Sequence, residues 1–325
     1  MRVTQGIIYA YNILPDKNFR KLGWQEIEEW FANKSGILWI HLDYTDTNAV
    51  RWLIEKSNLN QVIIENLLTE ETRPRVSKID EEWLIILRGI NHNPGSEPED
   101  MVTVRLAIDN QVVISTQKRN LRSVQDMSIL IEQNKGPSQT GELLVELLDR
   151  MVWRMEETID EMEETISNIE DKILLENEYI FRNMLADIRR QAIILKRYMA
   201  PEKEALTRLL LEQIDWLTKE DLIKLREVSE ALVRNIEDLD TVRERATVTY
   251  EELISHLSDQ LNKRIYLLSL IAAIFLPLTF LTGLFGTNIG GIPGATSNNA
   301  FSIFTLGMGV FLVFEIMLFK WKKWM

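Results

Sequence analysis

"IYLLSLIAAIFLPLTFLTGLF", residues 265–285, is a run of twenty-one residues without one charged side chain. As a helix, with a rise of about 1.5 Å per residue, it is long enough to cross the roughly 30 Å hydrocarbon core of a bilayer. A second apolar run, "FSIFTLGMGVFLVFEIMLF" at 301–319, contains one ionisable residue, Glu315. Two buried helices of a soluble core are the alternative. Two adjacent runs of this length favour a pair of transmembrane helices.

The charges beside the two runs predict their orientation. Basic residues precede the first run and follow the second: Lys263, Arg264, Lys320, Lys322 and Lys323. The connection at 286–300 carries no charge. Because basic residues accumulate on the cytoplasmic side of membrane proteins, we expect both termini and the basic tail at 320–325 in the cytoplasm. The neutral loop at 286–300 is then external.

Composition excludes several classes of function. The 325 residues include 49 acidic and 37 basic side chains, a net charge of −12, which disfavours a nucleic-acid partner. The chain has no Cys, so it can form neither a disulfide nor a thiolate metal site. It contains no GxxxxGK[ST], HExxH, GxSxG or CxxC motif. We therefore expect no enzyme activity, no catalytic residues and no cofactor.

Residues 1–140 alternate between short apolar runs and chain breakers, as in an α/β domain. Five segments are predicted as strands: "GIIYAYNI", "GILWIHLD", "EWLIILRGI", "MVTVRLAI" and "QVVIST". The stretch from Ala49 to Leu68 is predicted as a helix between them. This domain precedes the transmembrane pair, so we expect it in the cytoplasm. The overall class is an α+β membrane protein.

Beyond Gly141 the apolar residues recur at helical spacing. Residues 141–218 are predicted as acidic cytoplasmic helices, with Pro201 beginning a new helix. Thr218, with Asp221 three residues later, predicts a helix start. The stalk helix of 219–264 is then expected to continue into the first span, giving one helix roughly 100 Å long. Such a helix can transmit cytoplasmic movement to the bilayer, or it can be a static spacer.

Two spans per chain cannot enclose a water-filled path, so a transporter would need several copies around an axis. Helical spacing predicts the face that would line the pore: Asn262, Ile265, Ser269, Ala272, Leu276, Thr279 and Gly283. Leu268 and Leu276 could form an apolar constriction that closes by dewetting. Small residues also suit helix packing in lipid, which is the structural alternative.

Polar residues mark both ends of this span. Gly286, Thr287 and Asn288 follow it, and the Asn288 amide and backbone carbonyls could hold a hydrated cation without stripping its water. Three residues before it share one helix face, a tentative metal site or a helix-stabilising cluster: Glu252, His256 and Asp259.

The order of domains, with "FGTN" following "PLTFLTGLF", resembles the CorA superfamily of divalent-cation transporters. "IGGIPG", "ETRPRVS" at 71–77 and "KRYMAP" at 196–201 resemble its ZntB zinc-transporter branch. The resemblance implies a funnel-shaped homopentamer in the bacterial inner membrane. It also implies that Gly286, Thr287 and Asn288 are the signature at the outer mouth, and that Asn262 is the inner pore asparagine. Thr287 occupies the usual Met position, so the selectivity of Gly-Met-Asn members is not transferred.

The expected cargo is hydrated Zn²⁺, with Mg²⁺, Co²⁺, Ni²⁺ and Cd²⁺ as further candidates. Zinc prefers Cys and His, and the three histidines are far apart in sequence, so a dehydrated zinc site in the pore is not expected. The resemblance implies uptake coupled to protons, for which Glu315 is the one carboxylate within either span. Glu315 could instead reach the interface or pair with Lys263, Arg264 or Lys320. The rival function is a membrane-anchored sensor or coiled-coil scaffold without transport.

Overall fold

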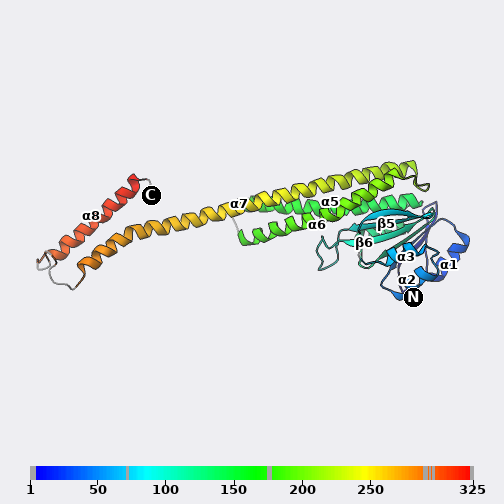
Figure 1. Ribbon diagram of the computed structural model, residues 1–325, viewed down its shortest axis with the longest axis horizontal. Coiled ribbons are helices and arrows are strands. Elements are labelled where there is room, and N and C mark those ends of the chain that lie inside the picture. Colours follow the sequence, from blue (N-terminus) through cyan, green and yellow to red (C-terminus); the bar gives the residue numbers. More distant parts are fainter. Residues whose placement is uncertain are drawn as a thin grey trace. The chain divides into compact units, whose positions relative to one another are not determined.

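The computed structural model describes residues 5–70, 73–173, 178–287, 292, 294 and 297–322. It divides into two units, Met1–Glu251 and Glu252–Met325. The first contains a β-sheet with helices on both faces, and the second contains the two apolar helical segments (Figure 1). This is the fold class expected from the sequence.

Within the described residues, seven strands form one sheet in the order β2-β1-β3-β7-β6-β5-β4. Their bounds are β1 Ile7–Ile13, β2 Phe19–Lys21, β3 Ile37–Asp43, β4 Arg75–Ile79, β5 Glu82–Gly89, β6 Val102–Ile108 and β7 Val112–Gln117. Neighbouring strands pair antiparallel except β3 and β7, which are parallel. The five predicted strands are confirmed. The sequence reading missed β2 and β4, the two edge strands, because edge strands are short and carry polar side chains.

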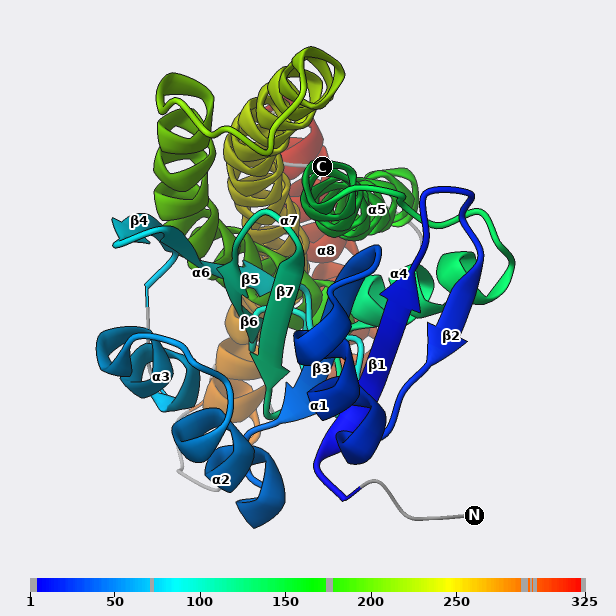
Figure 2. The same cartoon turned by 90° about the vertical axis from the view of Figure 1, so that its right-hand side faces the viewer.

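Three helices cover one face of the sheet (Figure 2): α1 Trp24–Asn33, α2 Thr47–Glu55 and α3 Gln61–Leu68. They bury Trp30, Leu53 and Ile63 against the strands. The single helix predicted over 49–68 is wrong, because Asn58 adopts a left-handed backbone with φ of 57° after α2. The Asn60 side chain then accepts a hydrogen bond from the Val62 N–H at 2.9 Å and caps α3.

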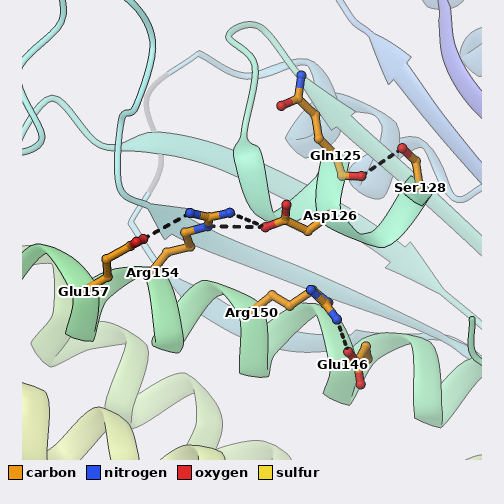
Figure 3. Close-up of polar contacts among 7 residues, drawn as sticks. All are labelled: Gln125, Asp126, Ser128, Glu146, Arg150, Arg154 and Glu157. Carbon is orange, nitrogen blue, oxygen red and sulfur yellow. Dashed lines mark hydrogen bonds and ion pairs between the residues drawn. The ribbon is translucent and has the colours of Figure 1, made fainter. Parts of the chain in front are cut away.

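The helices α4 Arg122–Glu132, α5 Thr140–Lys172 and α6 Glu178–Leu211 contact the other face. From β1, the Tyr11 hydroxyl donates to Glu132 of α4 at 2.7 Å. Figure 3 shows how α4 is joined to α5 by Arg154, which pairs with Asp126 at 2.8 Å and with Glu157 at 3.0 Å. The first unit is completed by the start of α7 Lys219–Phe285, and the second unit by α8 Ala300–Trp321.

Local signals predicted the start of α7 correctly and misplaced a boundary in α6. The Thr218 hydroxyl accepts from the Asp221 N–H at 3.1 Å, and the Asp221 carboxylate accepts from the Thr218 N–H at 2.9 Å, which confirms the predicted cap. Pro201 does not begin a helix; it lies inside α6. The next residue, Glu202, is held by a tertiary contact, accepting from the Arg88 N–H of β5 at 2.5 Å.

The buried carboxyl group of Glu202 should make the folded protein less stable as pH rises. It is 3% exposed, and burial raises its pKa to about 8 from the usual 4.5. A raised pKa in the folded state stabilises the protein fully below pH 4.5, and this contribution is lost as pH rises through about 8. We expect the Tm of the wild type to fall between pH 6 and 9, and that of Glu202→Gln to fall less. The exposed neighbour Glu204 provides the control, since Glu204→Gln should keep the wild-type profile. Coincident profiles for all three proteins would contradict this role.

Candidate ion pathway

The second unit contains the end of α7 and all of α8, which doubles back after the connection (Figure 1). Among the described residues, these two helices are long and apolar enough to cross a membrane. Their ends meet where the rings of Phe285 and Phe304 lie 5.4 Å apart. The two apolar runs therefore form a helical hairpin.

One face of each helix is half-buried within the hairpin. On α7 this face consists of Leu270, Ile274, Pro277, Leu278 and Leu281. On α8 it includes Phe304, Met308, Phe311, Leu312, Glu315, Ile316 and Phe319. These positions recur every three or four residues, as expected for two packed helices. The packing face of α8 was not predicted from the sequence. The helical spacing of its Phe, Met and Leu residues would have indicated it.

The predicted pore face is the opposite side of α7. At about 100° per residue, Ala272 is roughly half a turn around the helix from the face that packs on α8. The whole predicted set is exposed in a single chain: Asn262, Ile265, Ser269, Ala272, Leu276, Thr279 and Gly283. Leu268 and Leu276 flank the Ala272 direction, and Leu276 is 74% exposed. The hairpin therefore leaves this face of α7 uncovered.

Threonine hydroxyls on α7 bond to its own backbone. Thr279 Oγ1 donates to the carbonyl of Phe275 at 2.8 Å, and Thr282 Oγ1 donates to that of Thr279 at 3.0 Å. Pro277 has no N–H to donate to the Ala273 carbonyl, and the Thr279 hydroxyl bonds to the Phe275 carbonyl instead. The Thr279 oxygen remains available as an acceptor on the uncovered face.

The signature residues follow the last turn of α7. The Gly286 N–H donates to the Thr282 carbonyl at 2.8 Å, and a Cβ at Gly286 would lie only 2.8 Å from that oxygen. Only glycine fits there without displacing the backbone. Thr287 Oγ1 donates to the Leu284 carbonyl at 2.9 Å. Asn288 lies outside the described residues, so its predicted role at the mouth stays a prediction.

Glu315 lies on the half-buried face of α8, which packs on α7. Its Oε2 atom is buried and has no hydrogen-bond partner within the described part of the chain. The sequence left open an ion pair between Glu315 and Lys263, Arg264 or Lys320. The structure describes all four residues, and Glu315 forms no ion pair with any of the three bases within one chain. The carboxylate is thus held toward the interior of the hairpin.

The tentative metal site is not assembled within one chain. Across the ranges that the structure describes, no group of three His, Asp or Glu side chains is placed to hold a metal ion. From Glu252 to Asp259 the helix rises about 10 Å, too far for both carboxylates to reach one ion beside His256. His41 is a core residue instead: its Nδ1 lies 2.7 Å from Ser115 Oγ, and burial lowers its pKa to about 4.

Comparisons with known proteins agree with this arrangement. A family model described as CorA-like Mg²⁺ transporter protein matches residues 34–322. The zinc transport protein ZntB of Yersinia enterocolitica serotype O:8 / biotype 1B is 37% identical over 287 residues, 88% of each chain.

Two solved structures match nearly the whole fold. The full-length CmaX protein matches with a TM-score of 0.82 and 31% identity, covering 98% of both chains. The complete CorA magnesium transporter from Methanocaldococcus jannaschii matches with a TM-score of 0.83, covering 100% of both chains at 18% identity. The two known proteins therefore contain the same elements: the sheet, the long helix and the C-terminal hairpin.

Proposed function

Because this chain belongs to the CorA-like family of Mg²⁺ transporter proteins, we propose that it carries Zn²⁺ and other divalent cations through an axial pore lined by α7. The family is one of membrane transporters and not of enzymes. Zinc is favoured because a relative named as a zinc transport protein is 37% identical over 88% of the chain. The observation that carries the pore is the uncovered face of α7 centred on Ala272, half a turn from α8.

This face needs partners that a single hairpin does not provide. The family fold implies a homo-oligomer. Copies of α7 arranged around an axis would turn Ser269, Ala272 and Thr279 toward a shared channel and leave α8 on the outside. We propose five copies, following the resemblance of the sequence. Both termini would lie in the cytoplasm of a bacterial cell, with 286–300 external.

The ion would pass this channel with its water shell. Asn288 would receive it at the outer mouth and Asn262 would face it at the inner end. Between them, Thr279 and Ser269 offer hydroxyl oxygens to the hydrated ion. Leu268 and Leu276 would form the constriction, where apolar side chains exclude water and stop conduction. Neutral oxygens bind a hydrated divalent ion weakly, which allows it to leave.

Uptake by purified protein in proteoliposomes tests this function. We expect Zn²⁺ to enter vesicles containing the wild type, and Co²⁺, Ni²⁺, Cd²⁺ or Mg²⁺ to enter in parallel assays, each read with an enclosed fluorescent indicator. A membrane-anchored sensor or scaffold would give no flux with any ion. Flux equal to that of protein-free vesicles across the whole panel would therefore favour the rival function.

The same vesicles test whether protons drive uptake. Glu315 is half-buried between the helices, and its buried Oε2 atom lacks a partner among the described residues, as expected of a group that exchanges a proton during transport. An inward proton gradient should raise Zn²⁺ uptake by the wild type and should have little effect on Glu315→Gln. Glu252→Gln removes a carboxylate outside the apolar run and should respond as the wild type does. If Glu315→Gln keeps the full pH dependence, Glu315 is not the proton carrier.

A further inference from the structure

The first unit contains a pocket of about 830 Å³ beside strands β5 and β6, the segment that follows β7, and helix α6. Among the described residues, its lining includes six basic side chains against three acidic ones, although the whole chain carries a net charge of −12. The basic residues are Arg73, Arg88, Arg105, Lys118, Arg119 and Arg197. A local excess of positive charge in an acidic protein indicates a site for an anion.

Arg105 is the strongest indication. Its side chain rises from β6, is 1% exposed and stacks on the Tyr44 ring at 5.0 Å. The guanidinium donates from Nη2 to the Glu70 carbonyl at 2.8 Å, while its buried Nε has no partner within the described residues. A guanidinium remains charged even when buried, so an unused donor here is costly unless a ligand accepts from it.

The acidic residues of the lining neutralise only part of this charge. Glu70 pairs with Lys118, and Glu99 pairs with Arg190 outside the lining at 3.5 Å. Among the described residues, Arg119 forms no ion pair. Arg73 and Arg197 likewise form none among those residues, so three guanidinium groups remain for a ligand.

Helix α6 adds a planar wall to the pocket. The Arg88 and Arg197 guanidinium groups lie 4.3 and 5.0 Å from the centre of the Tyr198 ring. Stacking on the ring orders these long side chains before any ligand arrives. A planar guanidinium group can donate two parallel hydrogen bonds to the oxygens of one phosphate, whereas a lysine ammonium group acts as a point charge. The wall therefore favours phosphate over a simple halide.

We propose that this pocket binds a soluble organic polyphosphate of the nucleoside triphosphate class. The volume of about 830 Å³ lies within the range of pockets for small ligands and is too small for a nucleic acid duplex. Several guanidinium groups suit several phosphates. The proposal is independent of the transport function, because the pocket is formed entirely within the first unit.

Binding to the full-length protein in a neutral detergent tests the proposal. The probes are adenosine triphosphate, adenosine monophosphate and inorganic phosphate, at constant ionic strength and with chelator to remove divalent cations. We expect saturable calorimetric binding and a raised Tm with the triphosphate, and weaker effects with the other two. A short-chain phosphatidylglycerol is included to detect recognition of a lipid headgroup.

Variants locate the site. Arg119 is exposed, so Arg119→Gln should fold normally and weaken triphosphate binding about tenfold. Arg197→Gln, also at an exposed position of the lining, should do the same, whereas the buried Arg105 is left intact to avoid misfolding. Arg234→Gln makes the same change on an exposed position of α7 outside the pocket and should bind as the wild type does. Absence of saturable triphosphate binding, an equal loss in all three variants, or binding of the lipid alone would overturn the proposal. Zn²⁺ uptake is measured separately, so failure of either function is distinguishable.

Discussion

Replacing Ala272 by Trp is expected to reduce divalent-cation uptake to the level of protein-free vesicles. Ala272 lies at the centre of the uncovered face of α7, half a turn from the residues that pack on α8. If copies of α7 surround an axis, each copy brings a bulky indole to the same level of the channel. Several rings at one level would fill a channel that passes a hydrated ion. The measurement is the initial rate of Zn²⁺ uptake into proteoliposomes.

Val310 provides the matched control for this substitution. It lies on the side of α8 away from α7 and is 65% exposed, so Val310→Trp adds the same side chain to the lipid-facing side. We expect Val310→Trp to retain most of the uptake. Both variants should elute at the oligomer size of the wild type. Undiminished uptake by Ala272→Trp in a normally assembled protein would show that this face does not line the path.

Replacing Asn288 by Ala is expected to lower uptake by about an order of magnitude for every divalent ion tested. The physical reason is the loss of an uncharged amide oxygen where a hydrated ion enters. Because the ion keeps its water there, the loss should act on all divalent ions and not on zinc alone. The measurement is uptake at low ion concentration, where entry limits the rate.

Asn298 offers the comparison for Asn288→Ala. It lies in the same connection, is exposed, and precedes α8 by two residues. Asn298→Ala should transport as the wild type does, since the resemblance places the signature at 286–288. Equal uptake by both variants would remove Asn288 from the path. A loss restricted to Zn²⁺ would instead indicate a selective, partly dehydrated site.

Elements whose signals are local could be predicted from the sequence. Strand β5 is a run of buried apolar residues, and the Thr218–Asp221 pair caps α7 using only neighbouring residues. Elements that depend on distant residues could not. Pro201 has the local signature of a helix start, but α6 runs through it, and the buried Glu202 beside it contacts a strand more than a hundred residues earlier. The break between α2 and α3 could have been predicted from "SNLN" at 57–60, because Asn and Ser favour turns and helix caps.

The same distinction applies to the sites. The uncovered face of α7 was predictable because the geometry of one helix determines which of its residues share a side. The basic pocket was not, since Arg88, Arg105 and Arg197 lie on three different elements and meet only through the strand order and the position of α6. For the cluster at Glu252 the sequence left a metal site and a helix-stabilising cluster open, and among the described residues no three side chains are placed to hold a metal ion.

The Thr279 hydroxyl has a consequence for which ions a pore could admit. Its hydrogen is committed to the Phe275 carbonyl, so toward the channel it presents lone pairs alone. A belt of such oxygens would repel chloride and attract a metal ion's polarised waters, although no residue there is ionised. The discrimination would concern the sign of the charge rather than the identity of the metal. It would persist at any pH, since no titrating group produces it.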